Sequence, residues 1–340
     1  MTPGDTEAPQ TGCCSSEEES ACCEPEDKPK CCGAAGAGGK CGCKIATTAG
    51  RRAESVLDEL VSGAVAVDPA ESDRSVDAIS LSGLTKTYAD GSEAVRGVSL
   101  TVPVGETYGL LGPNGAGKST TLGMVGTLVR PSAGTALVAG LDVVSDRRVV
   151  RRRIGFALQQ AGVDEFATAL ELIMLQGRLQ GLPKKEAHRR ARLLLRLVDL
   201  DDVADKRLST FSGGMKRRVD LVSALVHLPQ VVLLDEPTEG LDPRSRAAIW
   251  DTLDELSRRL GITLVLTTHY MEEADRLCDR VGIVDRGTLV VEGTPEHLKA
   301  SVASEAAIAR PTLEDVYLHF TGRVFDDTSD SETSELRRAA

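Results

Sequence analysis

Short apolar runs alternate with longer amphipathic stretches through the middle of the chain. The runs are almost wholly apolar, are bounded by glycine or charged residues, and are typical of buried strands. They cover residues 107–112, 154–158, 231–235 and 263–269. The stretches at 184–200 and 244–260 repeat apolar residues at helical spacing. Strands that alternate with helices predict an α/β domain with a largely parallel sheet.

Residues 79–102 precede these elements and have a different pattern. Apolar and polar residues alternate there with a period close to two. This alternation is typical of strands with one buried face, so it predicts an antiparallel β subdomain. No internal repeat is found in the domain.

The first 76 residues differ from the rest of the chain. They are rich in Gly, Ala, Ser, Glu and Cys and lack an apolar period long enough to bury a core, so we expect a mostly disordered extension. The exception is residues 53–64, where Val56, Leu57, Leu60 and Val61 have helical spacing. This pattern is either a short amphipathic helix or an accident of composition. The polar end of the chain also reads as a tail.

Composition and charge restrict the class of protein. The 340 residues include 40 Lys and Arg against 51 Asp and Glu, a formal charge of -11, and this balance argues against a nucleic-acid partner. No run approaches the roughly 18 apolar residues that span a bilayer. The first ten residues lack the basic and apolar regions of a secretory signal. We therefore expect a cytosolic chain in a reducing compartment.

The sequence GPNGAGKST follows the first buried run and opens a helical pattern. It fits G-x-x-x-x-G-K-[ST] in the strand–loop–helix context of a phosphate-binding loop, which disfavours an ordinary Gly-rich turn. Glycines let backbone N–H groups surround phosphate, and the helix N-terminus adds free donors. Lys118 is predicted between the β- and γ-phosphates and Ser119 on Mg²⁺. The predicted contacts are Gly112, Pro113, Asn114, Gly115, Ala116, Gly117, Lys118, Ser119 and Thr120.

A second candidate site ends the apolar run VVLLDEP. Asp235 stands at the predicted strand tip, where α/β sheets place ligand groups, and suits a Mg²⁺ contact. Glu236 suits the orientation or deprotonation of an attacking water. The alternative is a solvated acidic turn, which the phosphate loop upstream disfavours.

The stretch FSGGMKRRVDL at residues 211–221 resembles the signature motif of ABC-transporter ATPases. Ser212, Gly213 and Gly214 match the motif, whereas Phe211 replaces Leu and Met215 replaces Gln. From the residues alone, Ser212 is also a helix N-cap that leaves backbone donors accessible. In that family the motif faces the γ-phosphate held by the other subunit.

The order of the remaining motifs matches the same family. By resemblance, Tyr88 stacks on adenine, and Gln159 contacts Mg²⁺ and the attacking water, although Gln160 is an alternative by position. Asp242 is the aspartate of the dimer contact, and His269 is the switch histidine that contacts the γ-phosphate. Each residue alone has a structural explanation, but their joint order and spacing favour the family.

The resemblance covers about residues 78–298 and extends to the daunorubicin-resistance group of ABC ATPases, to which RPTLEDVYLHFTGR at 310–323 is also similar. Two features depart from the family pattern. FATALEL at 166–172 replaces the usual sequence of the surface that meets the membrane subunit. The region between residues 299 and 311 is also shorter than usual.

The resemblance implies an ABC-type P-loop NTPase with an antiparallel β subdomain, a parallel-sheet core and a helical subdomain. The expected parts are a disordered Cys-rich extension (1–76), the ATPase domain (77–300), a short helical segment (301–323) and a disordered tail (324–340).

The implied activity is hydrolysis of ATP with Mg²⁺ by an exporter subunit. One chain has one phosphate loop and one signature, so we expect a homodimer joined by ATP. A separate transmembrane permease would hold it on the cytoplasmic face of the membrane. The alternatives are a soluble ABC-type ATPase without a transport role and a thiol-based metal sensor or buffer fused to an ATPase.

Eight of the nine cysteines lie in the first 43 residues. Three adjacent pairs recur at a spacing of nine, without the C-x-x-C spacing of zinc fingers. Clustered thiolates suit soft ions such as Cu(I), Zn²⁺, Cd²⁺, Hg²⁺ or arsenite. The alternative is a Cys-rich tail that leaves transport unaffected. The candidate ligands are Cys13, Cys14, Cys22, Cys23, Cys31, Cys32, Cys41 and Cys43; Cys278 is expected to be buried.

Overall fold

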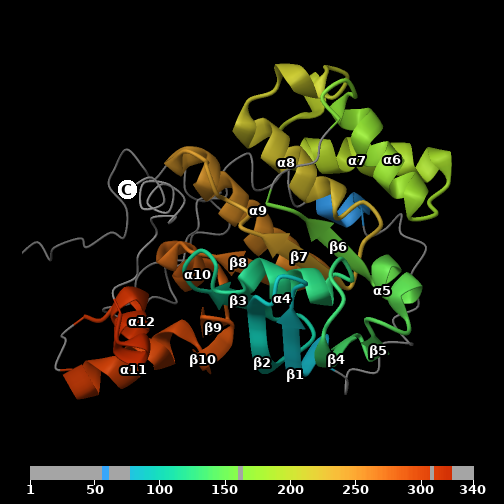
Figure 1. The fold of residues 1–340 in the computed structure, drawn as a ribbon. Helices are drawn as coiled ribbons and strands as arrows, with labels where there is room; N and C mark the ends of the chain where they lie inside the picture. The colour runs from blue at the N-terminus through green and yellow to red at the C-terminus, as the bar shows by residue number, and fades with distance from the viewer. Residues whose placement is uncertain (1–55, 61–76, 160–163, 307–309, 324–340) are drawn as a thin grey trace, which may run out of the picture. The chain divides into compact units, whose positions relative to one another are not determined.

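The computed structural model of the protein describes residues 56–60, 77–159, 164–306 and 310–323. Its central sheet has the strand order β10-β9-β3-β8-β7-β6 (Figure 1). All neighbours in this sheet are parallel except β10, which runs antiparallel to β9. The strands are β3 (Thr107–Leu111), β6 (Ile154–Ala157), β7 (Val231–Asp235), β8 (Thr263–Thr268), β9 (Arg280–Asp285) and β10 (Thr288–Gly293).

A second, antiparallel sheet has the order β2-β1-β4-β5. Its strands are β1 (Ile79–Thr87), β2 (Glu93–Val102), β4 (Ala133–Val138) and β5 (Leu141–Asp142). The antiparallel β subdomain predicted from the alternating pattern is confirmed, and β1 pairs with β2 within it. The α/β fold with an antiparallel β subdomain and a parallel core is confirmed.

Helices flank the central sheet and form a separate helical group. In Figure 1, α6 (Ala169–Leu179), α7 (Lys184–Leu197) and the start of α8 (Gly213–Ser223) lie together above the sheet, away from β1 and β2. The remaining helices are α4 (Lys118–Val125), α5 (Arg147–Arg153), α9 (Pro243–Leu260), α10 (Met271–Leu277), α11 (Pro295–Ala306) and α12 (Leu313–Thr321). No helix of the described ranges is both long and apolar enough to cross a membrane.

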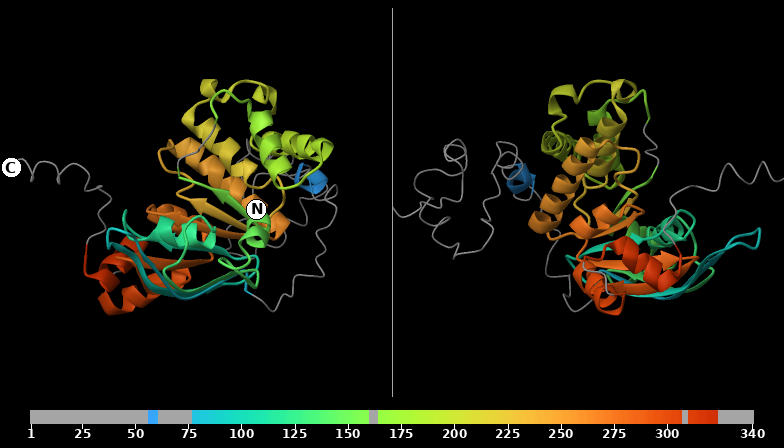
Figure 2. Two further views of the ribbon diagram at one scale, coloured as in Figure 1. Left: turned by 45° about the vertical axis from the view of Figure 1, so that its right-hand side comes forward. Right: turned by 90° about the vertical axis from the view of Figure 1, so that its left-hand side faces the viewer.

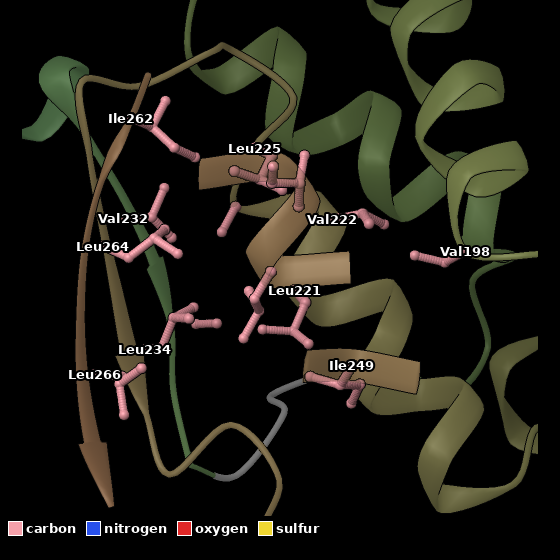
Figure 3. Close-up of a cluster of buried hydrophobic side chains, with 14 of the residues drawn as sticks. Val198, Leu221, Val222, Leu225, Val232, Leu234, Ile249, Ile262, Leu264 and Leu266 are labelled. Carbon is pink, nitrogen blue, oxygen red and sulfur yellow. The ribbon is translucent and has the colours of Figure 1, made fainter. Parts of the chain in front are cut away.

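Both faces of the central sheet are buried, which explains why its strands are apolar throughout. Successive side chains of a strand point to opposite faces. Val232 and Leu234 of β7 join the cluster that includes Leu221 of α8 and Ile249 of α9 (Figure 3). Leu233 belongs to the other cluster, which packs toward the antiparallel sheet and α4. This alternation of Val232 and Leu234 with Leu233 fixes which side chains of β7 face each cluster. Asp235, the last residue of β7, therefore stands at the end of the strand.

Residues 56–60 form a short helical turn that packs against the first hydrophobic cluster. Val56, Leu57 and Leu60 are buried among the residues of the first cluster, with exposed fractions of 3%, 1% and 0%. Arg189 of α7 donates from Nη1 to the Glu59 carbonyl at 3.0 Å. Arg259 of α9 places its Nη1 3.9 Å from Asp58 Oδ1. The helical alternative is therefore correct for residues 56–60, which link α7 to α9, whereas Val61 lies outside the described residues.

We expect Leu60→Ala to lower the free energy of unfolding by roughly 2–5 kcal/mol, because it removes a fully buried side chain and leaves a cavity. Leu179→Ala is the matched control, since Leu179 is 72% exposed. Urea unfolding followed by circular dichroism measures both. Equal stability of the two variants would contradict the burial of residue 60.

Candidate functional site

The phosphate loop lies between β3 and α4, and neighbouring strands approach it too closely for a side chain at two of its glycines. Gly117 has a φ of 99°, and a Cβ there would meet the Ala94 carbonyl oxygen at 2.3 Å. A Cβ on Gly112 would meet the Val284 carbonyl oxygen at 2.2 Å. A side chain at either position would therefore push the loop away from β2 or β9.

The loop ends at the N-terminus of α4, where no side chain caps the helix. Backbone N–H groups at such an end, together with the helix dipole, favour an anion. Lys118 is 3% exposed and donates from Nζ to the carbonyls of Gly112 at 2.7 Å and Pro113 at 3.1 Å. Its Nζ also lies 3.4 Å from Glu236 Oε1. A buried cation therefore stands beside free helix donors, which fits a polyphosphate.

Asp235 and Ser119 meet at the end of β7. Ser119 donates from Oγ to Asp235 Oδ1 at 2.8 Å, and Thr267 of the neighbouring strand donates to the same oxygen at 2.6 Å. The register pairs Asp235 with Thr267 directly across β7 and β8. A hydroxyl and a carboxylate at this distance are the hard oxygen donors that Mg²⁺ prefers. The donor set therefore fits the magnesium ion predicted for Ser119 and Asp235.

Glu236 is buried and surrounded by the other predicted site residues. His269 Nδ1 lies 3.2 Å from Glu236 Oε2, and Gln159 donates from Nε2 to the same oxygen at 3.3 Å. Burial raises the pKa of Glu236, but the hydrogen bond from His269 and the charge of Lys118 outweigh it and hold the pKa below its ordinary value. The carboxylate is therefore an anion at neutral pH, as a base or a water-orienting group must be.

The backbone of Glu236 has an unusual conformation. Its φ is 46°, in the left-handed region that costs a non-glycine residue on the order of 1–3 kcal/mol. Its N–H donates to the Thr267 hydroxyl at 3.0 Å and lies 3.2 Å from the Thr267 carbonyl. Thr267 of β8 therefore holds Glu236 in a backbone conformation that is unfavourable for a residue other than glycine.

Two groups of residues near Glu236 were not predicted from the sequence. Glu239 accepts from Gln159 Nε2 at 2.7 Å, a shorter contact than the one from Gln159 to Glu236. The fully buried Glu273 of α10 accepts from Thr238 Oγ1 at 2.7 Å and from Trp250 Nε1 at 2.9 Å. The only sequence signal for either group is its closeness to a recognised motif.

Tyr88 lies at the edge of the phosphate loop. It is 40% exposed, and its hydroxyl is 3.4 Å from Thr120 Oγ1, while Lys86 Nζ lies 5.1 Å from the ring centroid. A ring that is open on one face beside the loop suits stacking with a base. Its role with adenine stays a prediction.

The signature residues and Asp242 form a second group. Ser212 caps α8 and accepts from Met215 N–H at 3.3 Å. Asp242 caps α9, where its carboxylate accepts from Ser245 N–H at 3.0 Å and Ser245 Oγ at 2.6 Å. The two caps are neighbours, because a Cβ on Gly214 would lie 3.1 Å from Ser245 Oγ.

The structure thus brings six predicted residues together around the phosphate loop: Lys118, Ser119, Gln159, Asp235, Glu236 and His269. Cys278 is buried, as expected. Gln160 and the eight N-terminal cysteines lie outside the described residues. Among the residues that are described, no group of His, Cys, Asp and Glu side chains is arranged to hold a metal ion by itself.

The comparisons with known proteins agree with this geometry. The family model described as ABC transporter matches residues 95–239. The daunorubicin/doxorubicin resistance ATP-binding protein DrrA of Streptomyces peucetius is 49% identical over 227 residues, which are 67% of this chain and 68% of that protein. The chain belongs to the ABC transporter ATPase family. It therefore binds and hydrolyses ATP.

Other relatives extend the range of cargo that such ATPases serve. The Nod factor export ATP-binding protein I of Burkholderia lata is 46% identical over 204 residues, or 60% of this chain and 67% of that protein. Among solved ABC ATPases, cbiO1 of Clostridium perfringens, part of the transporter complex cbiONQ, covers 68% of this chain and 96% of its own. Its identity is 28% and the TM-score is 0.61.

A second solved neighbour is the dimeric ATP-binding cassette MJ0796 in a post-hydrolysis state with ADP and Pi. It covers 64% of this chain and 98% of its own, with 30% identity and a TM-score of 0.59.

Proposed function

We propose that this chain is the ATP-hydrolysing subunit of an exporter and drives a separate membrane permease on the cytoplasmic face of the membrane. The observation that carries the proposal is the arrangement of Lys118, Glu236 and His269 within hydrogen-bonding reach in a chain whose relatives are named for drug resistance. These three side chains follow β3, β7 and β8, at the ends of the strands where α/β sheets place ligand groups.

In the proposed reaction, Glu236 orients and deprotonates the water that attacks the γ-phosphate. Lys118 and the N-terminus of α4 bind the phosphates, and His269 holds the Glu236 carboxylate and contacts the γ-phosphate. Ser119, Asp235 and Gln159 would hold Mg²⁺, which when bound neutralises charge on the phosphate oxygens. Tyr88 would stack on the adenine.

We also propose that two copies complete each site. Ser212, Gly213 and Gly214 make no recorded hydrogen bond or ion pair to the phosphate loop of their own chain in the described ranges. The start of α8 offers backbone donors like those of a phosphate site. A head-to-tail homodimer, with Asp242 in its contact, would place this helix end against the partner's nucleotide. A dimeric solved neighbour supports this arrangement.

The permease is proposed to dock on the surface that begins at Phe166. This residue is 83% exposed and precedes α6, which starts with a Thr168–Glu171 capping box. An apolar aromatic ring in water next to a rigid helix is typical of a protein contact. FATALEL differs from the usual family sequence here, so we expect a permease matched to this chain.

We expect Phe166→Asp to abolish capture of the permease, because it puts a charge where the proposed contact would bury an aromatic ring. ATP hydrolysis by the isolated subunit should change by less than about twofold, because Phe166 is exposed on the surface. Leu179→Asp is the control, since Leu179 is also exposed but lies at the far end of α6. The tagged variants are compared by affinity purification from detergent-solubilised membranes and mass spectrometry. Capture of ribosomal or repair proteins in place of a polytopic membrane protein would favour a soluble ATPase without a transport role.

For the Cys-rich extension we propose binding of a thiophilic ion, which would link the exporter to metal or metalloid resistance. Eight cysteines within the first 43 residues support it. Elemental mass spectrometry measures metal per chain on protein purified anaerobically from cells given Zn, Cu, Cd or arsenite, beside the same protein without residues 1–45. Stoichiometric metal that disappears with the deletion supports the proposal, and the absence of metal in both contradicts it.

A further inference from the structure

Arg217 of α8 donates to the backbone of two loops that each carry a predicted site residue. It follows the signature motif by three residues, and its side chain is 7% exposed. Nε donates to the Pro237 carbonyl at 2.9 Å, and Nη2 donates to the carbonyls of Asp235 at 2.7 Å and Glu236 at 3.0 Å. One guanidinium therefore holds three successive carbonyls, from the last residue of β7 onward.

The same side chain reaches the loop of Gln159. Nη1 donates to the Leu158 carbonyl, lies 3.5 Å from the Gln159 carbonyl, and is 3.2 Å from Asp220 Oδ2. An arginine has five N–H donors in a rigid planar fork. All five are engaged here, and four of them donate to backbone carbonyls of the two loops. Such a set of contacts fixes the position of one loop relative to the other.

One of the residues whose backbone Arg217 binds is Glu236, which has the strained conformation described above. Glu236 has the left-handed φ of 46°. Its carbonyl accepts from Arg217 Nη2, so another backbone conformation at Glu236 would lose this hydrogen bond. The Gln159 side chain donates to Glu236 Oε2, so both the backbone and the side chain of Glu236 depend on elements that Arg217 fixes. A misplacement of about 1 Å in a reacting group is enough to lower a rate by roughly 100-fold.

We infer that Arg217 is a positioning residue that locks Glu236 and the Gln159 loop to the helix that begins with the signature motif. The inference rests on the proposed role of Glu236. This inference connects the two sites within one chain. In the proposed dimer the first turn of α8 faces the partner's nucleotide, and Arg217 in its second turn holds the backbone of Glu236 in the same chain. Movement of α8 upon dimer closure would then reach Glu236 without passing through the nucleotide.

Arg218 provides a matched control. It is the next residue of the same helix and has the same charge, but it donates from Nη1 to the Val198 carbonyl at 2.8 Å, in the helical group. Arg217→Lys keeps the charge and most of the length. A lysine has three donors on one nitrogen and cannot span both loops.

The test compares kcat, KM and ATP affinity of the full chain. We expect Arg217→Ala to lower kcat by about 10- to 100-fold with KM and ATP affinity within about twofold of wild type. Arg217→Lys should not restore the rate, and Arg218→Ala should keep it within about twofold. The inference is overturned if Arg217→Lys matches wild type, if only KM changes, or if the Arg217 and Arg218 variants lose the same rate.

A double-variant cycle separates this inference from the proposed function. Where Arg217 acts through Glu236, adding Arg217→Ala to Glu236→Gln should lower the residual rate by less than about twofold. A full additional loss would mean that Arg217 acts elsewhere. Wild-type activity of Glu236→Gln alone would contradict the proposed base. Loss of activity in Glu236→Gln with normal activity in Arg217→Ala would contradict only the role of Arg217.

Discussion

Glu236→Gln is expected to keep ATP binding and to lower kcat by about 100- to 10,000-fold, the usual contribution of a general base. Glutamine has the same size and shape, so contacts to Gln159 and the packing at the end of β7 are retained. The negative charge between Lys118 and His269 is lost. Under the proposed mechanism, in which hydrolysis opens the homodimer, the variant should also accumulate an ATP-bound dimer.

Phosphate release under steady state measures the rate, and size-exclusion chromatography with light scattering measures the dimer. Glu239→Gln is the control, because Glu239 also accepts from Gln159 Nε2 but is exposed, whereas Glu236 is buried. We expect its rate to fall by less than about tenfold. Near-normal turnover in Glu236→Gln, or equal losses in both variants, would defeat the assignment of the base.

Lys118→Ala should weaken ATP binding by roughly 2–5 kcal/mol, which corresponds to a loss of at least about 30-fold. The lysine is 3% exposed, and its ammonium is held against the phosphate loop by two carbonyls. Its removal leaves the Glu236 carboxylate buried beside the phosphates without its nearest cation. Like charges then face each other in a place that water reaches poorly.

Isothermal titration calorimetry with ATP at fixed Mg²⁺ measures the loss. Lys299→Ala is the control, because Lys299 forms an ion pair with Asp275 at 2.5 Å and lies on α11. Its ATP affinity should not change. An affinity of Lys118→Ala equal to that of the control would show that this loop does not carry the nucleotide.

Much of the site was predictable because its chemistry is local in the sequence. The phosphate loop follows directly from nine residues in a strand–loop–helix context. Asp235 and His269 could be expected near each other, because the carboxyl ends of parallel strands lie at one edge of a sheet. The structure makes β7 and β8 neighbours in the sheet.

Contacts that depend on packing could not be predicted in this way. Arg217 looks like one of several charged residues on a helix, and its backbone acceptors come from segments 18 to 59 residues distant along the chain. The hydrogen bond from Gln159 to Glu239 joins residues 80 positions apart in the sequence. It therefore depends on how the segments that follow β6 and β7 lie relative to each other. The pairing of β4 with β1 joins strands far apart in sequence, and no local pattern specifies such a partner.

Trp250 is the single tryptophan of the chain. Its indole donates to Glu273 of α10, which also accepts from Thr238 in the segment after Glu236. Arg276 lies over the ring, 5.2 Å from its centroid. The tryptophan fluorescence of the protein therefore originates at one place, beside the segment that follows Glu236. Stopped-flow emission after mixing with ATP would follow the rearrangement of this region in real time without an attached dye.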